Sequence, residues 1–200
     1  RVHMGTGAAT AGRGGAVVVT VGSGTSGSGG LVQAHAGRST VHTGGEVHVS
    51  SGEGTATSSG AITIRSVNAG AAGTSGYLSF SSGSSVTGNS GYIHMGTGVA
   101  TAGRGGMVLI SVGSGTSSVG GMVQAHAGRS TVHTGGAVVV TSGEGTATSS
   151  GVVLIRSSNS GEAGVSGSLL FSSGTSVTGN SGRVHMGTGA ATAGRGGAVV

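Results

Sequence analysis

The chain has 200 residues, of which 48 are Gly and none is Pro, Cys or Trp. Charged residues make up 6% and the net charge is +5, carried by Arg residues that form no basic run, so nucleic-acid binding is not expected. The lack of Cys excludes a disulfide scaffold, and the lack of a run of about 18 apolar residues argues against a membrane span.

The chain repeats itself at two lengths. RVHMGTGAATAGRGGAVV begins at Arg1 and recurs unchanged at Arg183, and a close variant begins at Tyr92. Each 91-residue super-repeat divides into six repeats that end on Gly, five of 15 residues and one of 16. A flexible Gly/Ser-rich linker has no reason to keep such a register. We therefore predict one continuous repetitive structure, with super-repeats at 1–91 and 92–182 and the start of a third at 183–200.

The first arm of each repeat has the pattern of a strand. Position 2 is β-branched or Leu in every repeat, as at Val17, Ile62 and Leu78, and position 4 is always apolar, as at Val19 and Phe80. Two apolar residues spaced two apart, on a β-branched background, predict a strand with one buried face. A helix would need a period near 3.6 and would be destabilised by the Gly content.

A turn and a second strand are expected to follow. Gly at position 7 of most repeats fits a turn with positive φ, and Asn68 and Asn159 fit the same role in the 16-residue repeats. Positions 9 and 11 are small, whereas positions 8, 10 and 12 are bulkier, so we expect positions 9 and 11 to face inward. In-register stacking would then place Arg38 beside Glu53 of the next repeat.

These patterns predict an all-β fold, a parallel β-solenoid with two strands per 15-residue repeat and six repeats per 91-residue super-repeat. Adjacent repeats would stack about 4.8 Å apart, and nearest-neighbour stacking would supply the stability. Residues 183–200 restart the repeat without a cap. We therefore expect a segment of a longer chain, or a unit that associates end to end.

No residues have the spacing of a catalytic, cofactor or metal site, and we expect no enzymatic activity. Glu46 and Glu53 fall on opposite arms of one repeat and the chain has no Asp, which argues against paired carboxylates or a Ser-His-Asp relay. Residues 22–27 (GSGTSG) match a phosphate-binding Gly pattern, but another strand is expected after them rather than a helix. The scattered His residues, such as His3 and His35, fit a solvated surface better than a metal site.

Two exposed features remain. Thr occupies position 10 at Thr10, Thr25, Thr40 and Thr55, and such a column suits plain β-surface better than ice binding or O-glycan attachment. In the second super-repeat, the outward positions 1 and 3 are unusually apolar, and a contiguous apolar face indicates burial against a partner. We therefore predict lateral self-association, in addition to end-to-end association, through Met107, Leu109, Met122, Leu154 and Leu170.

Repeats such as AVVVTVGSGTSGSGG (16–30) and EVHVSSGEGTATSSG (46–60) resemble the Gly/Ser/Thr-rich β-solenoid repeats of microbial extracellular fibres and adhesins. The likeness covers the whole chain. It implies an extracellular structural role, so we expect a filament or fibre segment built by stacking of β-repeats. An adhesin stalk or, less favoured, an ice-binding solenoid is the alternative.

Overall fold

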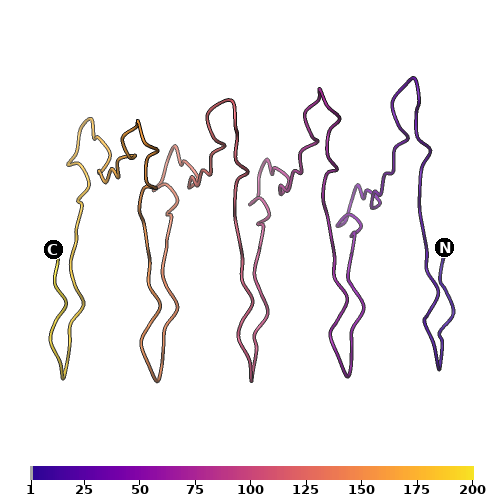
Figure 1. The fold of residues 1–200 in the computed structure, drawn as a ribbon, viewed down its shortest axis with the longest axis horizontal. Coiled ribbons are helices and arrows are strands. Elements are labelled where there is room, and N and C mark those ends of the chain that lie inside the picture. Colours follow the sequence, from indigo (N-terminus) through magenta and orange to yellow (C-terminus); the bar gives the residue numbers. More distant parts are fainter. Residues whose placement is uncertain (1) are drawn as a thin grey trace. The chain divides into compact units, whose positions relative to one another are not determined.

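The computed structural model describes residues 2–200, and none of these residues lies in a helix or a strand. Figure 1 shows the chain as a succession of narrow loops, without a coil or an arrow. The backbone divides into two units, Arg1–Gly96 and Thr97–Val200. Within each unit, the 15- or 16-residue repeat is the element of local structure.

Each repeat is one loop with a bend in its second half. The bend begins at position 10 of the 15-residue repeats and one residue later in the 16-residue repeats. In the first super-repeat the bends occupy 10–12, 25–27, 40–42, 55–57, 71–73 and 86–88. From residue 92 onward they occupy 101–103, 116–118, 131–133, 146–148, 162–164, 177–179 and 192–194. The loops therefore recur with the period of the sequence.

Hydrogen bonds between the two ends of the second arm close many of these loops. In several repeats the backbone N–H of position 15 donates to the carbonyl oxygen of position 7, at 2.8–3.0 Å. These pairs are Gly30 and Gly22, Gly45 and Gly37, Gly60 and Gly52, Gly136 and Gly128, and Gly151 and Gly143. In the repeats that begin the first and second super-repeats, a Thr hydroxyl closes the loop instead. Thr6 Oγ1 donates to the Gly15 carbonyl at 3.1 Å, and Thr97 Oγ1 to the Gly106 carbonyl at 3.4 Å.

Close approach at the base of the loop explains why some of the repeats end on Gly. A Cβ atom on Gly15 would lie 2.7 Å from the Cβ of Thr6, and one on Gly45 would lie 3.0 Å from the backbone nitrogen of Gly37. Such separations would force the two arms apart. At Gly60, Gly76 and Gly91 the nearest atoms would lie 3.4–3.5 Å from the Cβ, which is an ordinary van der Waals contact. At position 7, by contrast, a Cβ atom on Gly22 or Gly37 would meet open space.

The expectation of positive φ at position 7, and at Asn68 and Asn159, is wrong. No Gly or other residue among 2–200 has a positive φ. In the 16-residue repeat 61–76 the turn lies two residues after Asn68, where the Gly73 N–H donates to the Gly70 carbonyl at 3.4 Å. The extra residue shifts the bend along the chain without requiring a left-handed conformation.

The prediction of a parallel β-solenoid, with two strands per repeat and six stacked repeats per super-repeat, is also wrong. Every hydrogen bond found among residues 2–200 joins two residues of the same repeat, so no ladder links one repeat to the next. No described side chain is buried. The accessible surface is 19923 Å², compared with about 8,000 Å² for a folded monomer of this mass and about 27,000 Å² for a fully extended chain.

Composition gives the physical reason. Ordering one residue costs about 1–2 kcal/mol of conformational entropy, and Gly, nearly a quarter of this chain, loses the most. Burial returns roughly 25 cal/mol per Å² of apolar surface, and the Gly, Ala and Ser residues at positions 9 and 11 offer little such surface. Closing a short loop within one repeat costs less entropy than joining distant segments, so the repeats close on themselves.

Candidate functional site: exposed apolar positions and loop tips

The five apolar residues predicted to mediate association all lie in the second unit and are exposed. Their exposed fractions range from 71% to 86%. They are Met107, Leu109, Met122, Leu154 and Leu170. Because no part of the described chain covers them, their apolar surface is free to contact another molecule.

Position 2 of the first arm is less exposed than its neighbours although the arm forms no sheet. Val108, Val153 and Leu169, at position 2, are 47–54% exposed, clearly less than Met107 and Leu109 on either side of Val108. Successive side chains of an extended segment point to opposite sides. Positions 1 and 3 are therefore more open than position 2, as the sequence pattern predicts. Position 4 is nearly as exposed as position 3, at 67% for Ile110 and 72% for Leu109, so the opposite side forms no core.

Some loop tips are held by a Ser hydroxyl at position 9. Ser39 Oγ accepts hydrogen bonds from the backbone N–H of His42 at 2.9 Å and of Val41 at 3.4 Å. Ser85 Oγ accepts one from the Gly88 N–H at 3.0 Å. The equivalent contacts recur in the second super-repeat at Ser130 and Ser176. These local bonds satisfy backbone donors that the bend exposes.

Other tips depend on Gly at the same position. A Cβ on Gly24 would lie 2.7 Å from the Ser28 carbonyl oxygen, and one on Gly54 would lie 2.8 Å from the Ser58 carbonyl carbon. Gly145 repeats the arrangement of Gly54. Gly54 and Gly145 are also among the few described residues of intermediate rather than high exposure. The backbone approaches itself so closely at these tips that no side chain fits.

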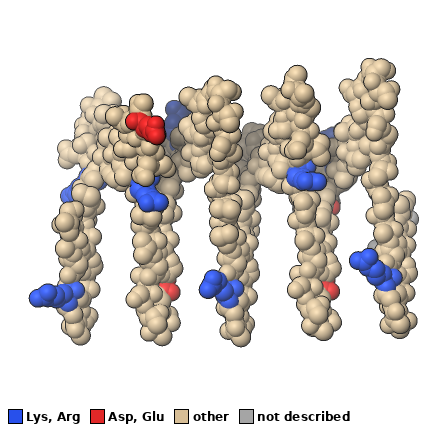
Figure 2. All heavy atoms as spheres, in the orientation of Figure 1, with Lys and Arg blue, Asp and Glu red and all other residues tan. Residues whose placement is uncertain are grey.

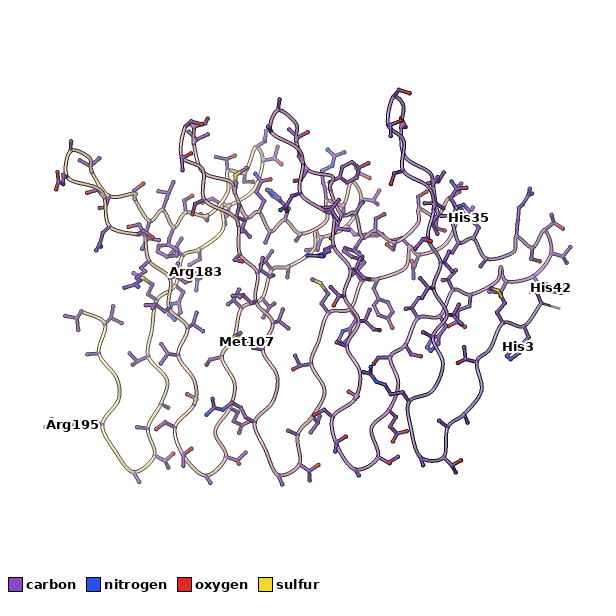
Figure 3. All side chains as sticks on the ribbon, turned by 45° about the vertical axis from the view of Figure 1, so that its right-hand side comes forward. His3, His35, His42, Met107, Arg183 and Arg195 are labelled. Atoms are coloured by element: carbon purple, nitrogen blue, oxygen red, sulfur yellow. The ribbon has the colours of Figure 1, made fainter. Side chains whose placement is uncertain are left out.

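The remaining residues singled out from sequence do not gather into a site. Thr10, Thr25, Thr40 and Thr55 begin the bends rather than line a sheet face. No group of three or more His, Cys, Asp or Glu in the described part of the chain is placed to hold a metal ion. In Figure 3, His35 lies apart from His3 and His42. Residues 22–27 form part of a loop tip and are followed by no helix.

The charged side chains are also dispersed. Arg and Glu occur as separate groups on the face shown in Figure 2. The sequence predicts Arg38 beside Glu53 in a ladder of stacked repeats. That prediction is wrong, because no ladder joins the two repeats. No cavity forms among residues 2–200, and no helix there has the length and apolar character to cross a membrane.

No family model, curated protein or solved structure matches the chain. Position 9 was read from sequence only as small, which missed its two roles at the tips. Its restriction mainly to Ser, Gly or Ala was the available signal, because Ser and Gly are the residues that bends favour.

Proposed function

We propose that the chain is a segment of an extracellular structural filament or fibre, assembled through its exposed apolar positions and without enzymatic activity. The observation that carries this proposal is the regular presentation of apolar side chains, at fixed positions of a repeating loop, with nothing in the described chain covering them. A repeated element that displays the same surface many times binds its own kind with high avidity.

The apolar positions supply the driving force for this assembly. Removing apolar surface from water is favourable by roughly 25 cal/mol per Å², and Met107, Leu109 and Leu154 are each more than 70% exposed. A second copy of the chain presents the same positions at the same spacing, so it is the partner that fits best. The likeness to repeats of extracellular fibres supports the extracellular setting.

The proposal is tested by the association state of the purified chain. Sedimentation velocity over a range of concentrations, with electron microscopy of the same samples, should show elongated assemblies that grow with concentration. A chain that remains monomeric at the highest soluble concentration would contradict the proposal. An adhesin stalk would instead bind a foreign surface while staying monomeric.

A further inference from the structure

The two Tyr residues of the chain occupy the same place in consecutive repeats. Tyr77 and Tyr92 are the first residues of repeats 77–91 and 92–106, and each follows a Gly. They are the only Tyr residues present. Position 1 is Ser168 and Arg183 in the corresponding repeats of the next super-repeat, so the pair occurs once in these 200 residues.

Both phenol rings project from the open side of the arm. Tyr77 is 89% exposed and Tyr92 is 87% exposed. The residues that follow them, Leu78 and Ile93, are 50% and 53% exposed. The two Phe residues, at position 4, are also less exposed than the Tyr residues. The register of the repeat therefore places the oxidisable phenols, rather than the Phe rings, where another chain reaches them.

The chain has few other ways to form a covalent link between copies. It contains no Cys for a disulfide and no Lys for an amine-derived cross-link. Tyr is the one residue type left in this chain whose side chain readily forms a carbon–carbon bond by one-electron oxidation.

We propose that Tyr77 and Tyr92 are oxidative cross-linking sites that join two copies of the chain through dityrosine. This inference rests on the proposed fibre function, which brings copies together. The oxidant is hydrogen peroxide used by a peroxidase-type catalyst. Each phenol loses one electron and one proton, and the two phenoxyl radicals couple at their ortho carbons. The two ring hydrogens then move to the oxygens and restore both phenols, while one peroxide is reduced to two waters.

Two cross-linking sites per chain make a specific prediction about product size. The full chain treated with peroxidase and hydrogen peroxide should give a ladder of covalent oligomers that carry dityrosine fluorescence. Tyr77→Phe or Tyr92→Phe alone leaves one site, so growth should stop at the covalent dimer. The double variant should lose both the ladder and the fluorescence. Acid hydrolysis and mass spectrometry of the products would identify the dityrosine.

A matched control tests the importance of position 1. Phe80→Tyr, placed in the double-variant background, supplies a phenol at the less exposed position 4. We expect it to couple more slowly than either natural Tyr under the same conditions. Equal rates would overturn the claim that the register of the repeat selects the cross-linking sites.

Other results would also overturn the proposal, separately from the fibre function. Fluorescent product confined to the monomer would mean that the two rings couple within one chain. A ladder that survives in the double variant would mean that other residues react. A chain that assembles without oxidant but yields no dityrosine would refute cross-linking alone. A chain that couples but never assembles without oxidant would refute the fibre proposal instead.

Discussion

The two super-repeats have similar bends but differ in side chains on the open side of the first arm. Ala16, Thr63 and Ser79 of the first correspond to Met107, Leu154 and Leu170 of the second. The bends lie at equivalent places in both. Because these side chains are exposed in each, the substitutions leave the bend in place and change the side chains that the loop presents. The position of the bend is therefore the same in both super-repeats, whereas the exposed side chains of the first arm vary.

The same comparison holds one informative exception at a loop tip. Repeat 16–30 is closed by the Gly30–Gly22 hydrogen bond, whereas the described residues of repeat 107–121 include no such bond between Gly121 and Gly113. The tip of 107–121 is wider, since a Cβ on Gly115 would lie 3.7 Å from the nearest carbonyl oxygens. Two positions in this tip differ, and they are Gly27 and Ser28 in one repeat and Ser118 and Val119 in the other. The open base therefore accompanies the wider tip, and the first arms of the two repeats differ as well, at positions 1, 3, 4 and 5.

The largest expected effect concerns association. Replacing Leu109, Leu154 and Leu170 with Ser should weaken self-association about 100-fold, since each buried Leu contributes roughly 1.5–3 kcal/mol and only part of each is covered at an interface. Sedimentation equilibrium would measure the change. Conversely, Thr63→Leu with Ser79→Leu should strengthen self-association through the first super-repeat. Unchanged association in the triple variant would show that the second super-repeat is not the contact surface.

The next effect concerns the tightest tips. Gly54→Ala would drive a Cβ into the backbone around Ser58 and should destabilise closure of that loop by about 1–3 kcal/mol. The amide of Gly60 would report this in NMR, through faster hydrogen exchange and a larger temperature coefficient. Gly52→Ala is the matched control, because a Cβ there meets open space. Similar behaviour of both variants would refute the close approach at Gly54.

A smaller effect is expected from exchanging the tips of the two equivalent repeats. Gly27→Ser with Ser28→Val should remove the Gly30–Gly22 bond, at a cost of about 0.5–1.5 kcal/mol. The reciprocal change, Ser118→Gly with Val119→Ser, should create the same bond at Gly121. Amide hydrogen exchange measures both changes, and it should become faster at Gly30 and slower at Gly121. If the bond persisted at Gly30, the cause would lie outside the tip.

The smallest effect is expected at the Ser tips. Ser39→Ala removes the acceptor for the N–H groups of Val41 and His42 and should destabilise the bend by about 0.5–1 kcal/mol, because these bonds are exposed to water. The amide shift of His42 would report the loss, with the intact Ser130 tip as an internal standard. Ser39→Thr keeps the hydroxyl and should retain the bend. An unaffected His42 amide in the Ala variant would contradict this role of Ser39.

The sequence predicts the repeat well and the tertiary fold poorly. The closing Gly of each repeat and the more open side at Met107 and Leu109 follow from the pattern. The bend does not, because the sequence predicts a turn at position 7 and a second strand over the positions where the structure has the bend. Stacking of the repeats was predicted wrongly. A period of two shows which side chains share a face, but it does not show whether burying that face offsets the entropy lost when Gly residues become ordered. The roles of Gly54 and Ser39 depend on distances between backbone atoms, which the residue pattern does not contain.

Hydrogen exchange of the dilute 200-residue chain tests the central claim, that each repeat is held together only within itself. The amides of positions 2–4, such as Val17–Val19, have no backbone partner, so they should exchange nearly as fast as those of an unstructured peptide. Protection of these amides by more than about 100-fold in repeat after repeat would reveal hydrogen bonds between neighbouring repeats and contradict the account.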